Sequence, residues 1–159
     1  MARVFIGIGS NEGDRLEHIS RGAQTLGALS QVQLVQMATI RETTPVGGPS
    51  QAAYLNTVVE LSTTLAPGDL LRTLKQIEVE AGRRPSDVRW GPRPLDLDLL
   101  FYDDRVIHEA GLDVPHPRLH ERRFVLEPLA ELAPDLVHPV LKRTVQDLLA
   151  NALNSSIVQ

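Results

Sequence analysis

The chain has 159 residues, of which 42% are hydrophobic and 23% charged, and its formal net charge is −4. This composition is typical of one globular domain, here residues 1–159. No stretch approaches the roughly 18 apolar residues of a membrane helix, and the N-terminus lacks the apolar segment of a signal peptide. Without cysteine, disulfides and thiolate zinc sites are excluded. We expect a cytoplasmic monomer with no membrane partner.

The acidic balance argues against nucleic-acid binding, which usually needs a basic face. Arginines are nevertheless concentrated in the middle and later chain. They are Arg83, Arg84, Arg89, Arg93, Arg105, Arg118, Arg122 and Arg123. Guanidinium groups match phosphate oxygens in pairs, so such a cluster in an acidic protein indicates a small polyanionic ligand. The alternative is a solvated surface, which explains most charge clusters.

The first half of the chain predicts two helices among three strands. Alternating apolar residues over 2–8 predict a strand, and Asp14 with Glu17 predicts the start of a helix. The apolar face of this helix contains Leu16, Ile19, Ala23 and Leu26. Two β-rich runs follow over 32–43 and 54–63. Pro67 and Gly82 then bound a second helix, whose apolar face contains Leu70, Leu71, Leu74 and Ile77.

A fourth strand is predicted over 95–102, which completes the order βαββαβ. This order predicts an α+β fold with a ferredoxin-like core and its helices on one face of the sheet. A Pro-rich loop, a short helix from Phe124 and a last helix opened by Thr144 form C-terminal helical additions. The glycines after the first strand, Gly7, Gly9 and Gly13, lack dinucleotide-fingerprint spacing, and no Walker A motif is present.

Asp96 and Asp98 are the strongest candidates for chemistry. They are two residues apart on a predicted strand, so both carboxylates leave the same face while Leu97 and Leu99 leave the other. Two carboxylates at this spacing suit a shared Mg²⁺ or a pair of Mg²⁺ ions. An ordinary half-exposed strand is the alternative. Because aspartate disfavours strands and arginines flank this one, we prefer the metal site.

The segment RWGPRPLDLDLLFYDDRVI, residues 89–107, closely resembles the signature of the 6-hydroxymethyl-7,8-dihydropterin pyrophosphokinases. Three further segments agree: IGSNEGDR at 8–15, ETTPVGGPSQAAYLN at 42–56 and VPHPRLHERRFVLEPL at 114–129. The resemblance extends over nearly the whole chain except its last twenty or so residues. It implies a folate-pathway enzyme that transfers pyrophosphate from ATP to 6-hydroxymethyl-7,8-dihydropterin and releases AMP.

The resemblance also implies roles for individual residues. Asp96 and Asp98 would bind two Mg²⁺, and with Arg83 and Arg93 they would form the catalytic group. The ATP-binding set would be Glu78, Arg83, Arg84, Arg93, His116 and Arg122, in which the arginines and His116 act as phosphate-binding cations. The pterin pocket would be Thr43, Thr44, Val46, Tyr54, Asn56, Trp90 and Phe124. Whether Arg83 or Arg84 is the main loop cation stays open, and Asp96 is the only candidate for a general base.

Each of these roles has a plainer alternative. Trp90 and Phe124 could be core aromatics, Glu78 a solvated helix residue and His116 part of a surface loop. Asn56, on a strand, could be satisfied by neighbouring backbone, although its amide also matches the amide-like edge of a pterin. At the level of the whole chain, the rivals are a non-catalytic ferredoxin-like module that binds a phosphorylated ligand and an RNA-binding module, which would need exposed aromatics and a basic balance.

Overall fold

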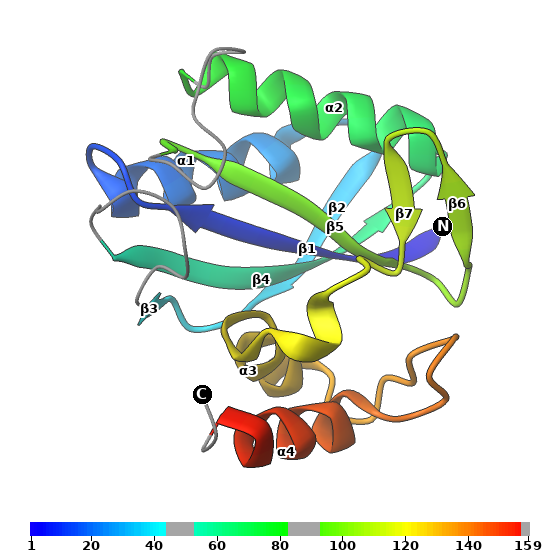
Figure 1. The fold of residues 1–159 in the computed structure, drawn as a ribbon. Helices are drawn as coiled ribbons and strands as arrows, with labels where there is room; N and C mark the ends of the chain where they lie inside the picture. The colour runs from blue at the N-terminus through cyan, green and yellow to red at the C-terminus, as the bar shows by residue number, and fades with distance from the viewer. Residues whose placement is uncertain (44–52, 83–92, 157–159) are drawn as a thin grey trace.

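The computed structural model describes residues 1–43, 53–82 and 93–156 (Figure 1). The larger sheet contains β1 (Ala2–Ser10), β2 (Val32–Met37), β3 (Arg41–Thr43), β4 (Tyr54–Thr63) and β5 (Asp96–Tyr102). The helices are α1 (Arg15–Ala28), α2 (Pro67–Glu80), α3 (Arg123–Leu132) and α4 (Val145–Ser156), with a short 3-10 turn η1 (Leu119–Glu121) before α3. No helix in these ranges is long and apolar enough to cross a membrane.

The sheet lies between two layers of helices, which gives three layers in all (Figure 1). Its strands run in the order β2-β4-β1-β5, with β3 paired to β4, and every pairing is antiparallel. Helices α1 and α2 cover one face, which we call the inner face, and α3 and α4 lie across the other, the outer face (Figure 1). The fold is therefore an α+β fold of helices on an antiparallel sheet.

Strand alternation divides the hydrophobic residues of the sheet between two cores. On β1, Val4, Ile6 and Ile8 belong to the inner core with α1 and α2, whereas Phe5 belongs to the outer core with α3 and α4. Beyond Phe5, the next two outer positions of β1 are glycines, Gly7 and Gly9. The outer core reaches Gly7, where Val58 pairs with it and the Leu100 side chain lies over it, whereas Gly9, Asn56 and Asp96 lie beyond the residues of this core.

The predicted helix boundaries are confirmed by their caps. The Asp14 carboxylate accepts a hydrogen bond from the Glu17 backbone N–H at 3.1 Å, and the Thr144 hydroxyl does the same for Asp147 at 3.1 Å. Gly82 follows Ala81, the C-cap of α2, with φ +106°, the left-handed conformation that ends many helices. These contacts satisfy backbone groups that the helix ends leave without intrahelical partners.

Three expectations about local structure are wrong. The run over 32–43 forms two strands, because Ala38 leaves the first strand and its N–H bonds instead to the Val58 carbonyl at 2.9 Å. Leu16 is 55% exposed, because the buried face of α1 begins one turn later, at Ile19. The loop after Tyr102 contains a hairpin of β6 (Ile107–Glu109) and β7 (Leu112–Val114), whose short alternating strands are weak signals in a sequence.

Candidate active site

Asp96 and Asp98 lie on the outer face of β5, as predicted. Leu97 and Leu99 between and after them are buried in the inner core, so strand alternation points the two carboxylates toward the side of α3 and α4. In the pairing with β1, Asp96 lies opposite Gly9 and Asp98 opposite Gly7. The carboxylates are thus beside the part of the sheet that has no side chains.

Asn56 lies on the other side of the same glycines. Asn56 on β4 and Asp96 on β5 both pair with Gly9, which is on β1 between them. The three residues therefore form one row across the outer face. Two strand spacings separate Asn56 from Asp96, roughly 9–10 Å. We call this strip the glycine floor: Gly7 and Gly9, bordered by Asn56 on β4 and by the aspartates on β5.

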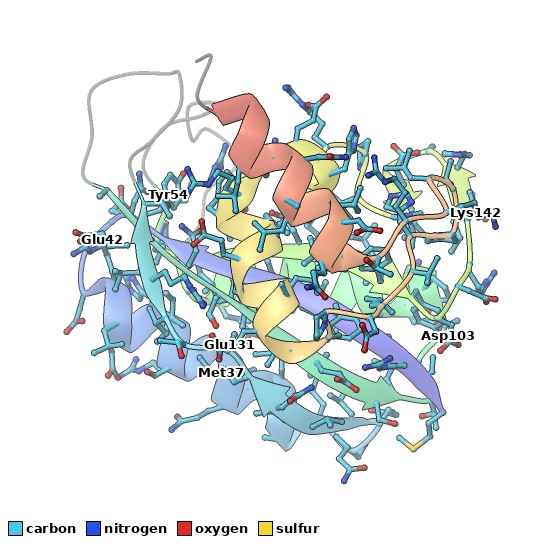
Figure 2. The ribbon with its side chains drawn as sticks, turned by 90° about the horizontal axis from the view of Figure 1, so that it is seen from below. Met37, Glu42, Tyr54, Asp103, Glu131 and Lys142 are labelled. Atoms are coloured by element: carbon cyan, nitrogen blue, oxygen red, sulfur yellow. The ribbon has the colours of Figure 1, made fainter. Side chains whose placement is uncertain are left out.

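Close packing at Gly9 explains why that position carries no side chain. A Cβ atom there would lie 2.9 Å from the Asn56 Oδ1 atom and 3.6 Å from the Tyr54 ring. The Asn56 amide itself is held by Thr43, since its Nδ2 donates to the Thr43 Oγ1 at 2.5 Å. Thr43, Tyr54 and Asn56, three of the predicted pterin residues, therefore meet at one end of the glycine floor. Tyr54 lies beside the outer helices rather than beneath them (Figure 2).

The Asp98 carboxyl lies in an unfavourable electrostatic environment for its charge. Burial, together with the carboxylates of Asp96 and Glu78, raises the pKa of Asp98 to about 7, against smaller opposing effects of Arg122 and Lys75. A divalent cation would offset this accumulation of negative charge. No group of three or more His, Asp or Glu side chains able to hold a metal is found in residues 1–43, 53–82 and 93–156. Two carboxylates suffice for Mg²⁺ when substrate phosphates supply further oxygens, so the residues present fit that ion.

Glu78 belongs to the same acidic group, and the solvated alternative for it is wrong. Its side chain is only 2% exposed, and its Oε2 accepts a hydrogen bond from the backbone N–H of Leu97 at 2.7 Å. Lys75 lies 3.6 Å from the other carboxylate oxygen. Leu97 separates Asp96 from Asp98, so Glu78 holds the backbone that carries both aspartates. Its ATP-binding role stays a prediction.

A bulge in β5 brings His116 to the site. Phe101 pairs with Phe5 and Leu99 with Ile6, which leaves Leu100 as the extra residue. The Leu100 carbonyl accepts a hydrogen bond from the His116 backbone N–H at 3.0 Å. Burial and the Arg122 guanidinium lower the pKa of His116 to about 4. His116 is therefore a neutral hydrogen-bonding group at neutral pH, where a cation was expected.

Arg122 connects these groups to Phe124. Its guanidinium carbon lies 5.7 Å from the centre of the Phe124 ring, and its charge acts on both Asp98 and His116.

Arg93, at the other end of the site, is held through its backbone by a residue that the sequence reasoning missed. Asn11 accepts the Arg93 N–H at 2.7 Å and donates its own N–H to the Arg93 carbonyl at 3.0 Å. Asn11 could have been predicted from the sequence by its position beside the glycines in the segment at 8–15.

The described part of the chain thus brings together most of the predicted residues. One group contains Asp96, Asp98, Glu78, His116, Arg122 and Phe124, and the other contains Thr43, Tyr54 and Asn56. Arg93 lies in neither group but beside Asn11, and the other predicted residues lie outside the described residues: Thr44, Val46, Arg83, Arg84 and Trp90.

Comparison with known proteins identifies the family of this chain. The family model of 7,8-dihydro-6-hydroxymethylpterin-pyrophosphokinase (HPPK) matches residues 5–134. The 2-amino-4-hydroxy-6-hydroxymethyldihydropteridine pyrophosphokinase of Aquifex aeolicus is 37% identical, over 92% of this chain and 90% of the relative. The Bacillus subtilis protein of the same name is 45% identical, over 81% of this chain and 77% of that protein.

Among solved structures, the Plasmodium falciparum HPPK-DHPS crystallised with pteroate aligns with a TM-score of 0.78 and covers 99% of this chain. The chain spans only 43% of that longer protein, and the 15% identity shows the likeness of fold alone. Family match and sequence relatives together settle the assignment. The chain belongs to the 7,8-dihydro-6-hydroxymethylpterin-pyrophosphokinase family.

Proposed function

We propose that the glycine floor and its two borders form the active site of an ATP-dependent pterin pyrophosphokinase. The chain is a diphosphotransferase of folate biosynthesis, as its family and named relatives are. It transfers pyrophosphate from ATP to 6-hydroxymethyl-7,8-dihydropterin and gives the pterin diphosphate and AMP. The observation that carries the site assignment is the row Asn56–Gly9–Asp96, in which an amide on β4 and a carboxylate on β5 lie on either side of a glycine.

The row accounts for the orientation of both substrates. Asn56, held by Thr43, would bind the amide-like edge of the pterin, and Tyr54 and Phe124 would contact its faces. The hydroxymethyl group would then point along the floor toward Asp96 and Asp98. These two carboxylates would hold two Mg²⁺, which supply positive charge to the triphosphate and to the acceptor oxygen.

The remaining residues would stabilise charge and fix geometry. The hydroxymethyl oxygen bonds to the β-phosphorus as its proton passes to solvent or to Asp96, the one candidate base, the bond between that phosphorus and the oxygen shared with the α-phosphate breaks, and AMP leaves with that oxygen. Arg93 and Arg122, with Arg83 or Arg84, would balance negative charge on the phosphates, and His116 would donate a hydrogen bond as a neutral imidazole. Positioning and charge account for most of the catalysis in such transfers.

The identity of the nucleotide product tests this proposal. Incubation with ATP, Mg²⁺ and 6-hydroxymethyl-7,8-dihydropterin should give AMP and the diphosphorylated pterin in equal amounts, and chelation of the metal should stop the reaction. Formation of ADP would show a γ-phosphoryl transfer at the same site. Nucleotide binding without consumption would favour the alternative, a non-catalytic module for a phosphorylated ligand.

We also propose a finer description of the fold and the setting. The strand order β2-β4-β1-β5 supports a ferredoxin-like core, and we propose that residues 1–159 form one domain that acts as a cytoplasmic monomer. The acidic net charge of −4 supports the absence of a nucleic-acid partner. Gel filtration tests the monomer directly.

A further inference from the structure

The short strand β3 carries one end of the pterin subsite but is weakly held by the sheet. It has three residues, Arg41–Thr43, and pairs with β4 alone. Its last residue, Thr43, accepts the hydrogen bond that orients the Asn56 amide. A strand of this length forms few ladder hydrogen bonds and opens easily unless other contacts hold it. The side chains that fix β3 therefore help to fix the Asn56 amide.

One group of these contacts runs from β3 to helix α3, while the Arg15–Glu42 ion pair at 3.0 Å joins β3 to α1. Arg41 pairs with Asn56 across the two strands, so its side chain leaves the same outer face. Its Nη2 donates to the Glu131 carboxylate at 2.9 Å, and its Nε lies 4.0 Å from Glu127. Thr39, two residues earlier, donates both its backbone N–H (3.0 Å) and its hydroxyl (3.2 Å) to Glu131. Glu131 is labelled on α3 beside Met37 in Figure 2.

The carboxylates that Arg41 contacts lie on the same face of α3 as Phe124. Residues 124, 127 and 131 are three and seven positions apart, which places them within an arc of roughly 60° on a helix with 3.6 residues per turn. A contact at Glu127 and Glu131 therefore fixes the rotation of α3 about its own axis. That rotation sets the direction in which Phe124 leaves the helix.

We propose that Arg41 is a positioning residue for the pterin subsite, which sets Asn56 through β3 and Phe124 through α3. The inference rests on the proposed function, because it assumes that the pterin binds between these two elements. It assigns Arg41 no contact with either substrate. Among the described residues, the hydrogen bonds and ion pairs of the Arg41 side chain run to Thr39, Glu127 and Glu131 and not to Asp96 or Asp98, so its effect should fall mainly on the pterin.

The chemistry of Glu131 supports a well-formed contact. Burial alone would raise the pKa of Glu131, but the hydrogen bonds from Thr39 and Arg41 outweigh it and lower the pKa. Both side chains are about a third exposed, 31% for Arg41 and 35% for Glu131. An ion pair this exposed contributes little to global stability. Its effect should therefore appear in local geometry rather than in the melting temperature.

The test is substrate affinity in Arg41→Ala and Arg41→Lys. Binding of fluorescent 6-hydroxymethylpterin is titrated with saturating Mg²⁺ and α,β-methylene ATP, whose bridge cannot be cleaved by attack on the β-phosphorus. We expect Arg41→Ala to raise the dissociation constant for the pterin about tenfold and Arg41→Lys about threefold, because lysine keeps the charge but not the paired geometry. The dissociation constant for the ATP analogue should change by less than about twofold.

Arg21→Ala is the matched control. Arg21 makes a similar ion pair with Glu17 at 2.6 Å on α1, far in sequence from β3 and α3, and its loss should leave both affinities within about twofold of wild type. In a Phe124→Ala background, Arg41→Ala should raise the dissociation constant for the pterin only about threefold, because Arg41 can then act on the pterin through Asn56 alone.

Three outcomes would overturn the inference: unchanged pterin affinity in Arg41→Ala, equal loss for pterin and ATP analogue, or an undiminished effect in the Phe124→Ala background. Failure of the proposed function looks different. In that case the wild-type protein itself would not bind 6-hydroxymethylpterin, whereas failure of the inference alone leaves wild-type binding intact.

Discussion

The two faces of the sheet use the same strands for different purposes. On the inner face, Val4, Ile6 and Ile8 of β1 and Leu97 and Leu99 of β5 pack against α1 and α2, and every one is at most 5% exposed. On the outer face, the same strands present glycines and aspartates. The inner face at these positions is wholly apolar, whereas the outer face of the same strands also holds the like charges of Asp96 and Asp98.

The outer face is itself divided. Phe5 and Phe101 meet edge to face with ring centres 6.4 Å apart, beneath α3 and α4. Two residues further along β1 the aromatic side chains give way to Gly7. The bulge at Leu100 marks this boundary, since it allows both Leu100 and Phe101 to join the outer core. The buried apolar residues and the predicted catalytic residues thus lie at different ends of the same strands, as well as on different faces of the sheet.

The largest effect should come from Asp98→Ala. We expect kcat to fall about a thousandfold, which corresponds to roughly 4 kcal/mol of barrier, because one of two metal-binding carboxylates is removed. The raised pKa of Asp98 means that its ionised form opposes folding above pH 4, so without Mg²⁺ the variant should be at least as stable as wild type. AMP release and thermal unfolding measure the two quantities. Retention of more than about a tenth of wild-type kcat would refute the metal role.

Leu97→Ala, one residue away, should show the reverse pattern. Leu97 is 1% exposed in the inner core, and truncation of a buried leucine costs about 2–5 kcal/mol of unfolding free energy. Chemical denaturation measures this loss. Below the unfolding transition, the folded fraction should keep kcat within about threefold of wild type. A large loss of kcat with little loss of stability would contradict the view that inner-face residues stabilise the fold while outer-face residues perform the chemistry.

The sequence predicted the features that depend on local pattern. The common face of Asp96 and Asp98 follows from strand alternation, and the caps at Asp14 and Thr144 follow from residue type. It could not predict the burial of Glu78, because that depends on α2 lying against the free edge of β5. The neutral state of His116 likewise depends on burial and on Arg122, and the Asn11–Arg93 contact joins residues 82 apart in sequence. Such tertiary contacts leave no periodic signal.

Gly9→Ala should have a smaller effect, confined to the pterin end of the floor. The added methyl group would lie 2.9 Å from the Asn56 Oδ1, so the amide must turn away from its present position. We expect the dissociation constant for 6-hydroxymethylpterin to rise about fivefold, or roughly 1 kcal/mol, and that for ATP to stay the same. Isothermal titration measures both.

Gly7→Ala provides the matched control for this clash. A Cβ at Gly7 would meet its nearest neighbours, Leu100 and Asp98, at 3.7–3.8 Å, an ordinary contact distance. Asn56 is not among these neighbours, so its amide should stay in place. Equal losses of pterin affinity in the two variants would show that any methyl group on the floor obstructs the ligand, and that the Asn56 contact is not the cause.

The smallest effect should come from His138, at the covered end of the outer face. Its ring meets Phe101 edge-on with centres 5.7 Å apart, and its Nδ1 accepts backbone N–H groups from Val140 (3.2 Å) and Leu141 (3.1 Å). An Nδ1 that accepts two hydrogen bonds cannot carry a proton without losing them. Burial, with a smaller contribution from the charge of His120, lowers the pKa of His138 below its usual 6.5.

Because the folded-state pKa is lowered, the unfolded chain binds a proton more readily than the folded one. The stabilisation by neutral His138 is therefore complete above about pH 6.5 and is lost as the pH falls toward the folded-state pKa, by no more than ~1.4 kcal/mol per pH unit for one proton. Urea unfolding between pH 8 and 5 should show this decline, and His138→Asn, whose side-chain oxygen can still accept but does not titrate, should make it shallower. His108→Asn, which removes a 75% exposed imidazole from the β6–β7 hairpin, is the control. If both variants flatten the profile equally, the decline does not originate in the covered end of the outer face, and the loss of stability at low pH must be sought elsewhere in the molecule.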